Sequence, residues 1–302
     1  MDHAQYALQD VRSQDVLRNY FLVTKPRLIA ANLISAAGGF FLAAQGQVSA
    51  VLFLSLMVGM SCIVASGCVL NNYIDRYIDR GMTRTRGRAL ATGAISLRGS
   101  LVYAAALGLA GAAILLSGTN ALCAVIALFG FVVYVCVYSL YLKRNSAYST
   151  VIGSLAGAAP PLAAYCAVRG DFDLGAVIVL AVFSLWQIPH SYAITIFRYN
   201  DYAAVSIPVM PVKAGIAATK KHIVWHIAAF ILAAQLLTVF GYAGYAYLGV
   251  ATALGLCWLA TALHGYRAGD DRAWARRVYL FSILTIFILS VMMSVDFVRS
   301  VG

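Results

Sequence analysis

The stretch that decides the fold is residues 51–80, VLFLSLMVGMSCIVASGCVLNNYIDRYIDR, in which a long apolar run leads directly into Asn71, Asp75 and Asp79. A helix needs about 20 apolar residues to cross a bilayer, and residues 51–70 meet that requirement. Positions four apart share one face of a helix, so the amide and the two carboxylates form a stripe roughly 12 Å long. The stretch therefore predicts a membrane span with a polar stripe at its end.

Two carboxylates at this spacing repel each other, and near a membrane they are also costly to desolvate. A cation between them would remove both costs, and oxygen ligands favour a hard ion such as Mg²⁺, which commonly shares its shell with a substrate phosphate. The alternative is a solvated helix end at which Arg76 and Arg80 neutralise the acids.

A basic loop follows the stripe, with Arg84, Arg86 and Arg88 close together. Metal-binding carboxylates beside arginines are the complementary pair that a Mg²⁺–diphosphate requires, because the arginines can neutralise the phosphate oxygens. Lys143 could extend this anion site, and Arg144 next to it fits the role of a topology anchor better.

The rest of the chain has the same membrane character, with 62% hydrophobic and 11% charged residues. Recurrent apolar segments predict an all-α, polytopic membrane protein with nine spans. We expect these spans near residues 28–44, 49–70, 100–117, 120–142, 148–168, 174–197, 222–242, 246–264 and 278–297.

The positive charges predict the orientation of these spans. With the N-terminus inside, only Arg169 and Arg299 of the 22 Lys and Arg residues fall outside. This bias is typical of cytoplasmic loops and places the N-terminus in the cytoplasm and the C-terminus in the periplasm. It also accounts for the net charge of +11, so we expect no nucleic-acid partner.

The first 24 residues contain Asp2, Asp10 and Asp15, which is unlike a signal or transit peptide. A bacterial inner membrane is the simplest location. We expect a cytosolic segment over 1–27, a single transmembrane domain over 28–297 and a short periplasmic tail over 298–302.

The sixth predicted span carries a second group of polar residues in SLWQIPHSYAITIFRYNDY, residues 184–202. If the helix persists, His190, Arg198 and Asp201 lie roughly on one stripe. An ionisable residue inside a membrane indicates function by default. The alternative is a histidine that is simply hydrogen-bonded to a neighbouring helix.

Several runs together carry a resemblance: TKPR (24–27), NNYIDRYIDR (71–80), RTRGRAL (84–90), VYSLYLKR (137–144), GAAPPLAAYCAV (157–168), SLWQIPHSYAI (184–194) and FRYNDY (197–202). From about Tyr20 to Phe297 the chain resembles the UbiA superfamily of intramembrane prenyltransferases, and within it the members that farnesylate haem. The resemblance implies nine helices around a lipid-open cavity, capped by two long cytosolic loops over 71–99 and 198–221.

The resemblance also implies an activity, which is transfer of the farnesyl group of farnesyl diphosphate to a vinyl group of haem B with addition of water. It implies Mg²⁺ as cofactor, and it suggests a haem A synthase or an oxidase-assembly protein as partner. The alternatives are a prenyltransferase that uses an aromatic quinone precursor and, from a different class, a transporter of haem or lipid.

Site residues carry over from the resemblance by matching motifs. It implies Asn71, Asp75 and Asp79 as the metal and catalytic motif, with Arg198 and Asp201 as further catalytic residues from a second motif. It implies Arg84, Arg88 and Lys143 as diphosphate contacts, and the sixth span supplies His190 and Trp186 for haem. A neutral imidazole is a common axial ligand of haem iron, and a proton shuttle is the other role open to His190. Arg198 could hold a haem propionate or the diphosphate, with Asp201 orienting it.

Overall fold

A computed structural model describes residues 15–298, and in this range the membrane domain is built of helices. Within that range nine helical segments are long and apolar enough to cross a membrane, which confirms the predicted polytopic all-α fold. Residues 15–23 form a short helix before the first span. The elements after it are α2 (Pro26–Ala44), α3 (Ala50–Gly81), α4 (Ala89–Thr92), α5 (Leu97–Gly118), α6 (Ala121–Val132), η1 (Val133–Leu142), α7 (Lys143–Asn145), α8 (Ser149–Arg169), α9 (Leu174–Phe197), α10 (Tyr199–Ala204), α11 (Met210–Lys213), α12 (Ile216–Val239), α13 (Tyr245–Leu263), η2 (His264–Arg267) and α14 (Asp271–Val295). Residues 1–14 and 299–302, which include most of the predicted tail, lie outside the described range.

The helices extend beyond the predicted spans where polar residues continue them. α3 runs through the acidic stripe to Gly81, so the loop expected over 71–99 begins only at Met82. α12 begins at Ile216 and α14 at Asp271, where Asp270 caps the helix by accepting from two backbone amides. Hydropathy identifies the part of a helix that meets lipid, whereas backbone hydrogen bonds continue into the polar residues beyond it.

The fourth span changes its helical geometry near the acidic stripe. Residues 133–142 form a π-helix, in which the Ser139 hydroxyl donates to the carbonyl of Tyr134 at 2.8 Å. π-helical turns are rare and are frequent at functional sites. Here the wider turn of the π-helix directs the Ser139 side chain toward α3. The π-helix is followed directly by Lys143, the first residue of α7.

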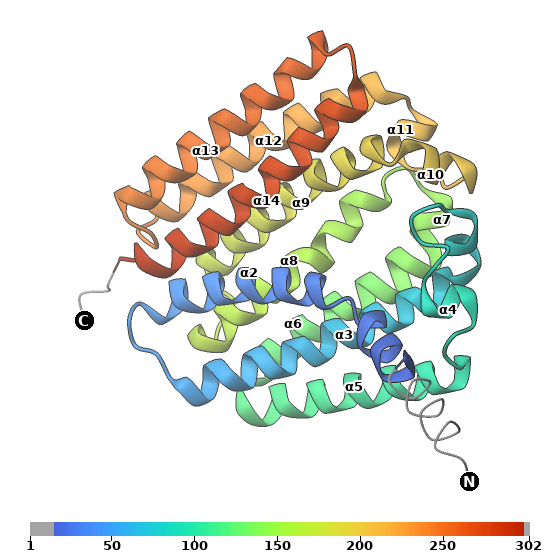
Figure 1. Ribbon diagram of the computed structural model, residues 1–302. Coiled ribbons are helices and arrows are strands. Elements are labelled where there is room, and N and C mark those ends of the chain that lie inside the picture. The colour runs from blue at the N-terminus through green and yellow to red at the C-terminus, as the bar shows by residue number, and fades with distance from the viewer. Residues whose placement is uncertain (1–14, 299–302) are drawn as a thin grey trace, which may run out of the picture.

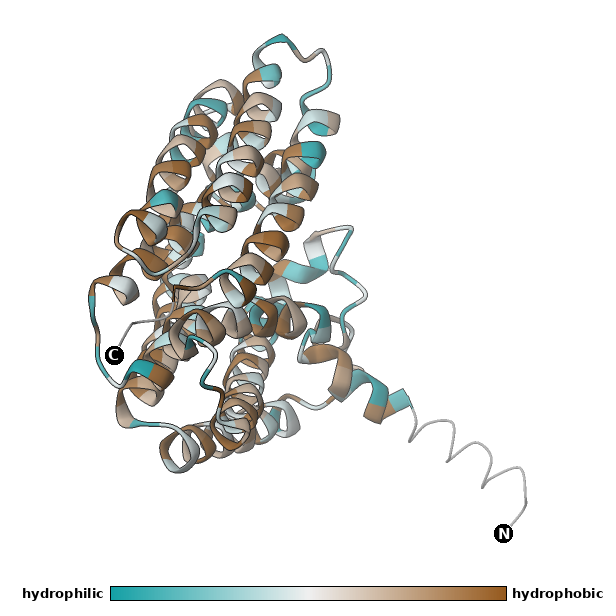
Figure 2. Ribbon diagram, turned by 90° about the vertical axis from the view of Figure 1, so that its left-hand side faces the viewer, coloured by the Kyte–Doolittle hydropathy of each residue, from teal (hydrophilic) through white to brown (hydrophobic). Residues whose placement is uncertain are grey.

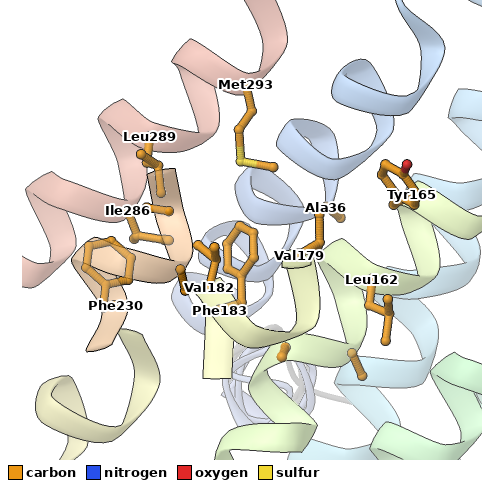
Figure 3. Packing of buried hydrophobic residues seen from close by; sticks show 14 of the residues in the cluster. Ala36, Leu162, Tyr165, Val179, Val182, Phe183, Phe230, Ile286, Leu289 and Met293 are labelled. Atoms are coloured by element: carbon orange, nitrogen blue, oxygen red, sulfur yellow. The ribbon is translucent and has the colours of Figure 1, made fainter. Parts of the chain in front are cut away.

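The spans pack as two connected groups (Figure 1). One contains α9, α12, α13 and α14, and the other contains α3, α5, α6 and α8, while α2 packs against both α8 and α14. Figure 3 shows part of the apolar core, with labelled residues that include Ala36 of α2, Leu162 of α8, Phe183 of α9 and Leu289 of α14. Figure 2 shows hydrophilic residues in loops at the helix ends and on the short helix before α2.

Close helix packing in the centre depends on small residues. A Cβ atom at Gly39 of α2 would lie 2.2 Å from the backbone oxygen of Pro161 in α8, so any larger residue must separate these two helices. Gly153 and Gly157 of α8 would likewise contact Tyr138 and Gln187. Small residues four apart on one helix face allow membrane helices to approach closely in this way.

The end of the bundle that carries residues 82–96, 198–215 and 264–270 is here named the basic face. At this face the segment between α9 and α12 folds over the end of α3, where Met82, Ile207 and Val209 form a small buried cluster. Val205 contacts the same end, because a Cβ at Gly81 would meet its side chain at 2.5 Å. The two long loops therefore lie together as a cap over the acidic stripe.

Candidate active site

Asp75 is the most enclosed acidic residue of the predicted stripe, with 1% of its side chain exposed. Its Oδ2 accepts from Lys143 Nζ at 2.5 Å and from Asn71 Nδ2 at 2.9 Å. Its Oδ1 is buried without a hydrogen-bond partner, and Arg144 Nη2 lies 4.0 Å from it. A buried carboxylate oxygen without a partner is costly, so it indicates a place for a further ligand.

Asp79 lies one turn further along α3 and pairs with the loop that follows. Arg88 Nη1 donates to both of its carboxylate oxygens, at 3.0 and 2.8 Å. The loop is held in this position because the Thr85 hydroxyl donates to the backbone carbonyl of Asp79 at 3.2 Å. The predicted meeting of the stripe and the arginine loop is therefore present for Arg88.

Asn71 links the stripe to two other helices. Its amide nitrogen donates to Ser139 Oγ at 3.1 Å as well as to Asp75, and its oxygen accepts from Lys25 Nζ at 2.6 Å. Lys25 has a left-handed backbone, with φ of 56°, immediately before Pro26 at the start of α2. A non-glycine residue in this conformation is strained, and such residues concentrate at functional sites.

Lys25 and Ser139 were not predicted as site residues. In the sequence, Lys25 stands out only as part of a Lys–Pro pair immediately before a membrane span, where apolar packing does not explain a lysine. Ser139 has no signal in the sequence, because only the π-helix turns it toward Asn71.

The residues fit a divalent metal with a diphosphate. The free Oδ1 of Asp75 is the oxygen type that Mg²⁺ prefers. Four cationic side chains surround the stripe, namely Lys25, Arg88, Lys143 and Arg144, so positive charge exceeds the two carboxylates. Among the described residues no three His, Cys, Asp or Glu side chains cluster as a metal site. A metal here would thus take part of its shell from the substrate.

Next to the stripe, α2, α3, η1, α8 and α9 enclose a cavity of about 300 Å³. Its lining reaches Cys68, one turn before Asn71, and is otherwise largely apolar and aromatic. Tyr134 and Tyr138 stack in it, with ring centroids 6.2 Å apart. The aromatic rings can stabilise positive charge, and the apolar walls limit the access of water.

Of the aromatic residues near the polar ends of the second, fourth and sixth predicted spans, only some face the cavity. Tyr138 and Trp186 line it. Tyr77 and Tyr141 are exposed, and Tyr73 packs against a separate small cluster beside α5. The position of each residue around its helix decides whether its side chain faces the cavity, because neighbouring residues of one helix point in different directions.

His190 of α9 also lines this cavity and is in contact with α14. Its Nδ1 is 2.7 Å from Ser282 Oγ, and its ring stacks on Trp186 with centroids 4.8 Å apart. Trp186 Nε1 donates to the backbone oxygen of Ser282 at 2.8 Å, so both residues predicted for haem meet the same point of α14.

The hydrogen-bond network assigns the tautomer of His190. We assign the single hydroxyl hydrogen of Ser282 to the Tyr279 carbonyl at 2.6 Å, which leaves Ser282 Oγ as the acceptor for His190 Nδ1. The neutral ring then carries its hydrogen on Nδ1, and Nε2 keeps a lone pair. That lone pair is the form a metal ligand needs, and the expected alternative of a hydrogen bond to a neighbouring helix is also present.

Arg198 and Asp201 do not continue the His190 stripe, because α9 ends at Phe197 and the chain turns into α10. They line a second cavity at the basic face, together with Arg84. No ion pair joins Arg198 to Asp201; their direct link is a backbone hydrogen bond of 3.0 Å. The structure thus brings together Asn71, Asp75, Asp79, Arg88 and Lys143, and separately Arg84, Arg198 and Asp201.

The capping segment still reaches the stripe through Tyr202. Burial raises the pKa of its phenol, Tyr138 and Asp75 act in the same direction, and Lys143 and Arg84 oppose them. Tyr202 therefore remains a neutral hydroxyl close to Asp75 and Lys143 at the stripe and to Arg84 of the second cavity.

The chain belongs to the UbiA prenyltransferase family, whose sequence pattern matches residues 32–290. It is thus an intramembrane prenyltransferase, in agreement with the fold and with the acidic stripe. Among its curated relatives, the protoheme IX farnesyltransferase of Chromohalobacter salexigens is 58% identical over 282 residues, which is 93% of this chain and 96% of the relative. That of Sodalis glossinidius is 58% identical over 283 residues, or 93% and 95% of the two chains.

Solved structures confirm the fold. A structure described for digeranylgeranylglyceryl phosphate synthase superposes with a TM-score of 0.75 at 17% identity, and it covers 92% of this chain and 99% of the other. A UbiA homolog from Archaeoglobus fulgidus, bound to GPP and Mg²⁺, superposes with a TM-score of 0.70 at 15% identity and covers 91% and 99%.

Proposed function

We propose that this protein transfers the farnesyl group of farnesyl diphosphate to a vinyl group of haem B, giving haem O and diphosphate, with Mg²⁺ as cofactor. The observation that carries the proposal is the placement of Asp75 and Asp79. They lie among four cationic side chains, roughly two to three helical turns beyond Cys68, which lines the same aromatic cavity as His190. The names of the curated relatives support the same reaction.

The chemistry balances with these substrates and water. The C1–O bond of farnesyl diphosphate breaks, and its electron pair leaves with the diphosphate. The terminal vinyl carbon forms the new bond to C1, and the positive charge left on the other vinyl carbon takes up water and loses a proton. Bound Mg²⁺ would neutralise negative charge on the leaving group.

The residues of the chain have distinct parts in this reaction. Asp75 and Asp79 would hold the metal, while Arg88, Lys143 and Lys25 would exchange their carboxylate and amide partners for diphosphate oxygens as charge develops there. Tyr134 and Tyr138 would shield the allylic cation from water. His190, with its free Nε2, would bind the iron of haem, and Trp186 would hold the imidazole ring in place.

The topology belongs to the proposal as well. We infer a bacterial inner membrane, with the basic face and the N-terminus in the cytoplasm and the C-terminus in the periplasm, on the distribution of Lys and Arg. This orientation gives the diphosphate site direct access to cytosolic Mg²⁺ and farnesyl diphosphate. A haem A synthase or an oxidase-assembly protein is the class of partner that would take up the product.

The decisive experiment incubates purified protein with haem B, farnesyl diphosphate and Mg²⁺ and measures the mass of the porphyrin product. We expect an increase of one farnesyl and one hydroxyl group. Mesohaem, in which the vinyl groups are reduced, is the matched control and should not react. If 4-hydroxybenzoate is prenylated instead, the protein is a quinone-type member. If haem or lipid crosses the membrane without any product, it is a transporter.

A further inference from the structure

The proposed reaction makes two opposite demands on water. The allylic cation of the farnesyl group must be shielded from water, whereas the cation left on the vinyl carbon must take up one water molecule. The cavity that Tyr138 and His190 both line, here named the aromatic cavity, has largely apolar walls. Water that moved freely in it would reach both cations, so the reaction requires one water molecule held at a fixed place.

Polar side chains on the α2 wall of the aromatic cavity are already used within the protein. The amide of Asn32 donates to the carbonyl of Leu28 at 2.8 Å, and the Ser35 hydroxyl donates to that of Ala31 at 3.3 Å. Both hydrogen bonds lie within one helix. The single hydroxyl hydrogen of Ser35 is therefore not available for a ligand.

Gln187 and Ser191, on the α9 wall, keep unused hydrogen-bonding groups. Gln187 Nε2 lies 3.5 Å from Ser191 Oγ, and both residues line the cavity. Within residues 15–298, Gln187 Oε1 accepts no hydrogen bond and Ser191 Oγ donates none. The pair thus offers an acceptor and a donor, and exchanging the amide oxygen and nitrogen would still leave one group of each kind. A water molecule, which both donates and accepts, matches this pair.

A second observation comes from the helical turn before Gln187. Ser184 Oγ is buried, and no group in the described part of the chain forms a hydrogen bond with it. Ser184, Gln187 and Ser191 follow one another at spacings of three and four residues, so they lie on one face of α9. Buried polar atoms that a protein leaves unpaired are commonly satisfied by ordered water. This face of α9 therefore carries polar groups for water over roughly two helical turns.

The glycine face of α8 places Gln187 beside the aromatic rings. A Cβ atom at Gly153 would lie 2.9 Å from the Tyr138 ring, and one at Gly157 would lie 2.9 Å from Gln187 Oε1. The two glycines are one turn apart, roughly 6 Å along the helix. The acidic stripe, which Lys143 contacts, lies toward the start of α8, so Gln187 lies beyond the rings from it. Water held there is next to the aromatic rings and away from the breaking C1–O bond.

We propose that Gln187 and Ser191 hold the water molecule that is added to the vinyl group. This inference rests on the proposed function and assigns two residues that the proposed chemistry left without a part. Ser191 donates to the water oxygen, and Gln187 Oε1 accepts one of the water hydrogens, so the remaining lone pair can face the cation. That lone pair forms the new C–O bond, and a proton of the water passes to the released diphosphate. No oxidant or reductant takes part.

The cation has a second outcome if no water is held beside it. It can lose a proton from the neighbouring carbon and form an alkene, whose mass is lower than that of the alcohol by one water molecule. Both products carry the farnesyl group. Their ratio therefore reports the capture of water separately from the binding of either substrate and from the rate of farnesyl transfer.

The test measures this ratio by mass spectrometry of the porphyrin product after purified protein is incubated with haem B, farnesyl diphosphate and Mg²⁺. Wild type should give predominantly the alcohol. In Gln187→Leu and in Ser191→Ala the ratio of alcohol to alkene should fall roughly 2–10-fold, the range for one lost hydrogen bond, and it should fall further in the double variant. Ser35→Ala is the matched control, because Ser35 lines the same cavity but donates to its own helix, and it should keep the wild-type ratio. Binding of zinc protoporphyrin shows that each variant is folded.

Several results would overturn the inference. If both variants keep the wild-type ratio at full turnover, this pair does not hold the water. If turnover falls at an unchanged ratio, the two residues shape the cavity or bind the porphyrin instead. In isotopically labelled water the alcohol must carry the label, and an unlabelled hydroxyl group would exclude a water site. A wild type that forms no farnesylated haem would instead refute the proposed function itself.

Discussion

Replacing Ser282 with alanine tests whether the structure prepares His190 to bind iron. Ser282 is fully buried, and within residues 15–298 its hydroxyl oxygen is the only hydrogen-bond partner of the His190 ring. Alanine removes that acceptor, and the hydrogen on Nδ1 is no longer held there. The ring can then turn or change tautomer, so Nε2 presents its lone pair for only part of the time.

The magnitude follows from the kind of contact that is lost. Groups that orient a metal-binding histidine typically change metal affinity 10–100-fold when removed. This corresponds to roughly 1.4–2.8 kcal/mol in the free energy of haem binding. The free energy of unfolding should fall by only about 1 kcal/mol, because the other bond of the hydroxyl is made to its own helix, at Tyr279.

The assay titrates haem B and metal-free protoporphyrin against wild type and Ser282→Ala and records the Soret band. Haem B should bind 10–100-fold more weakly to the variant, with a shifted band. Metal-free protoporphyrin has no iron to ligate and should bind both proteins equally. Ser290→Ala is the matched control, because Ser290 is also buried on α14 and donates only to its own helix, at Ile286.

Two results would refute the reasoning. An unchanged Soret band and affinity for haem B in Ser282→Ala would mean that Ser282 does not hold an iron ligand. Equal weakening of haem B and metal-free protoporphyrin would mean that the substitution only changes the shape of the porphyrin site. In the first case, if turnover nevertheless fell, His190 would be better described as a proton shuttle.

Further predictions concern the acidic stripe, the orientation and the core. Asp75→Asn removes a charge from the buried carboxylate and should lower turnover roughly 10²–10³-fold in the product-mass assay while zinc protoporphyrin still binds; near-normal turnover with unchanged Mg²⁺ dependence would contradict the metal assignment. In a cysteine-free background, Gly87→Cys should resist impermeant thiol reagents added outside intact cells and Phe172→Cys should label, whereas the reverse pattern would invert the topology. Gly39→Ala would place a Cβ 2.2 Å from a backbone oxygen of α8 and should destabilise the protein by about 1–3 kcal/mol, measured as loss of folded protein on heating; an unchanged transition would show that α2 and α8 can separate freely.

The sequence was sufficient for the class of fold and for the centre of the chemistry. Apolar segments of bilayer length predict nine spans, because lipid leaves the backbone few alternatives to a helix. The spacing of Asn71, Asp75 and Asp79 placed them on one face, and the structure joins Asn71 to Asp75 by a hydrogen bond of 2.9 Å. Helical periodicity is local, so residues within one helix could be related without knowledge of its neighbours.

Contacts between helices were decided only by the tertiary structure. Lys25 and Asn71 are 46 residues apart, and His190 and Ser282 are 92 apart. No periodicity relates such positions. The π-helix that turns Ser139 toward the stripe packs against α3 and α8. Because α9 ends at Phe197, Arg198 lies in a different cavity from the one that His190 lines. Local sequence determines which face of a helix is polar, whereas the packing of the helices determines which polar groups of different helices come into contact.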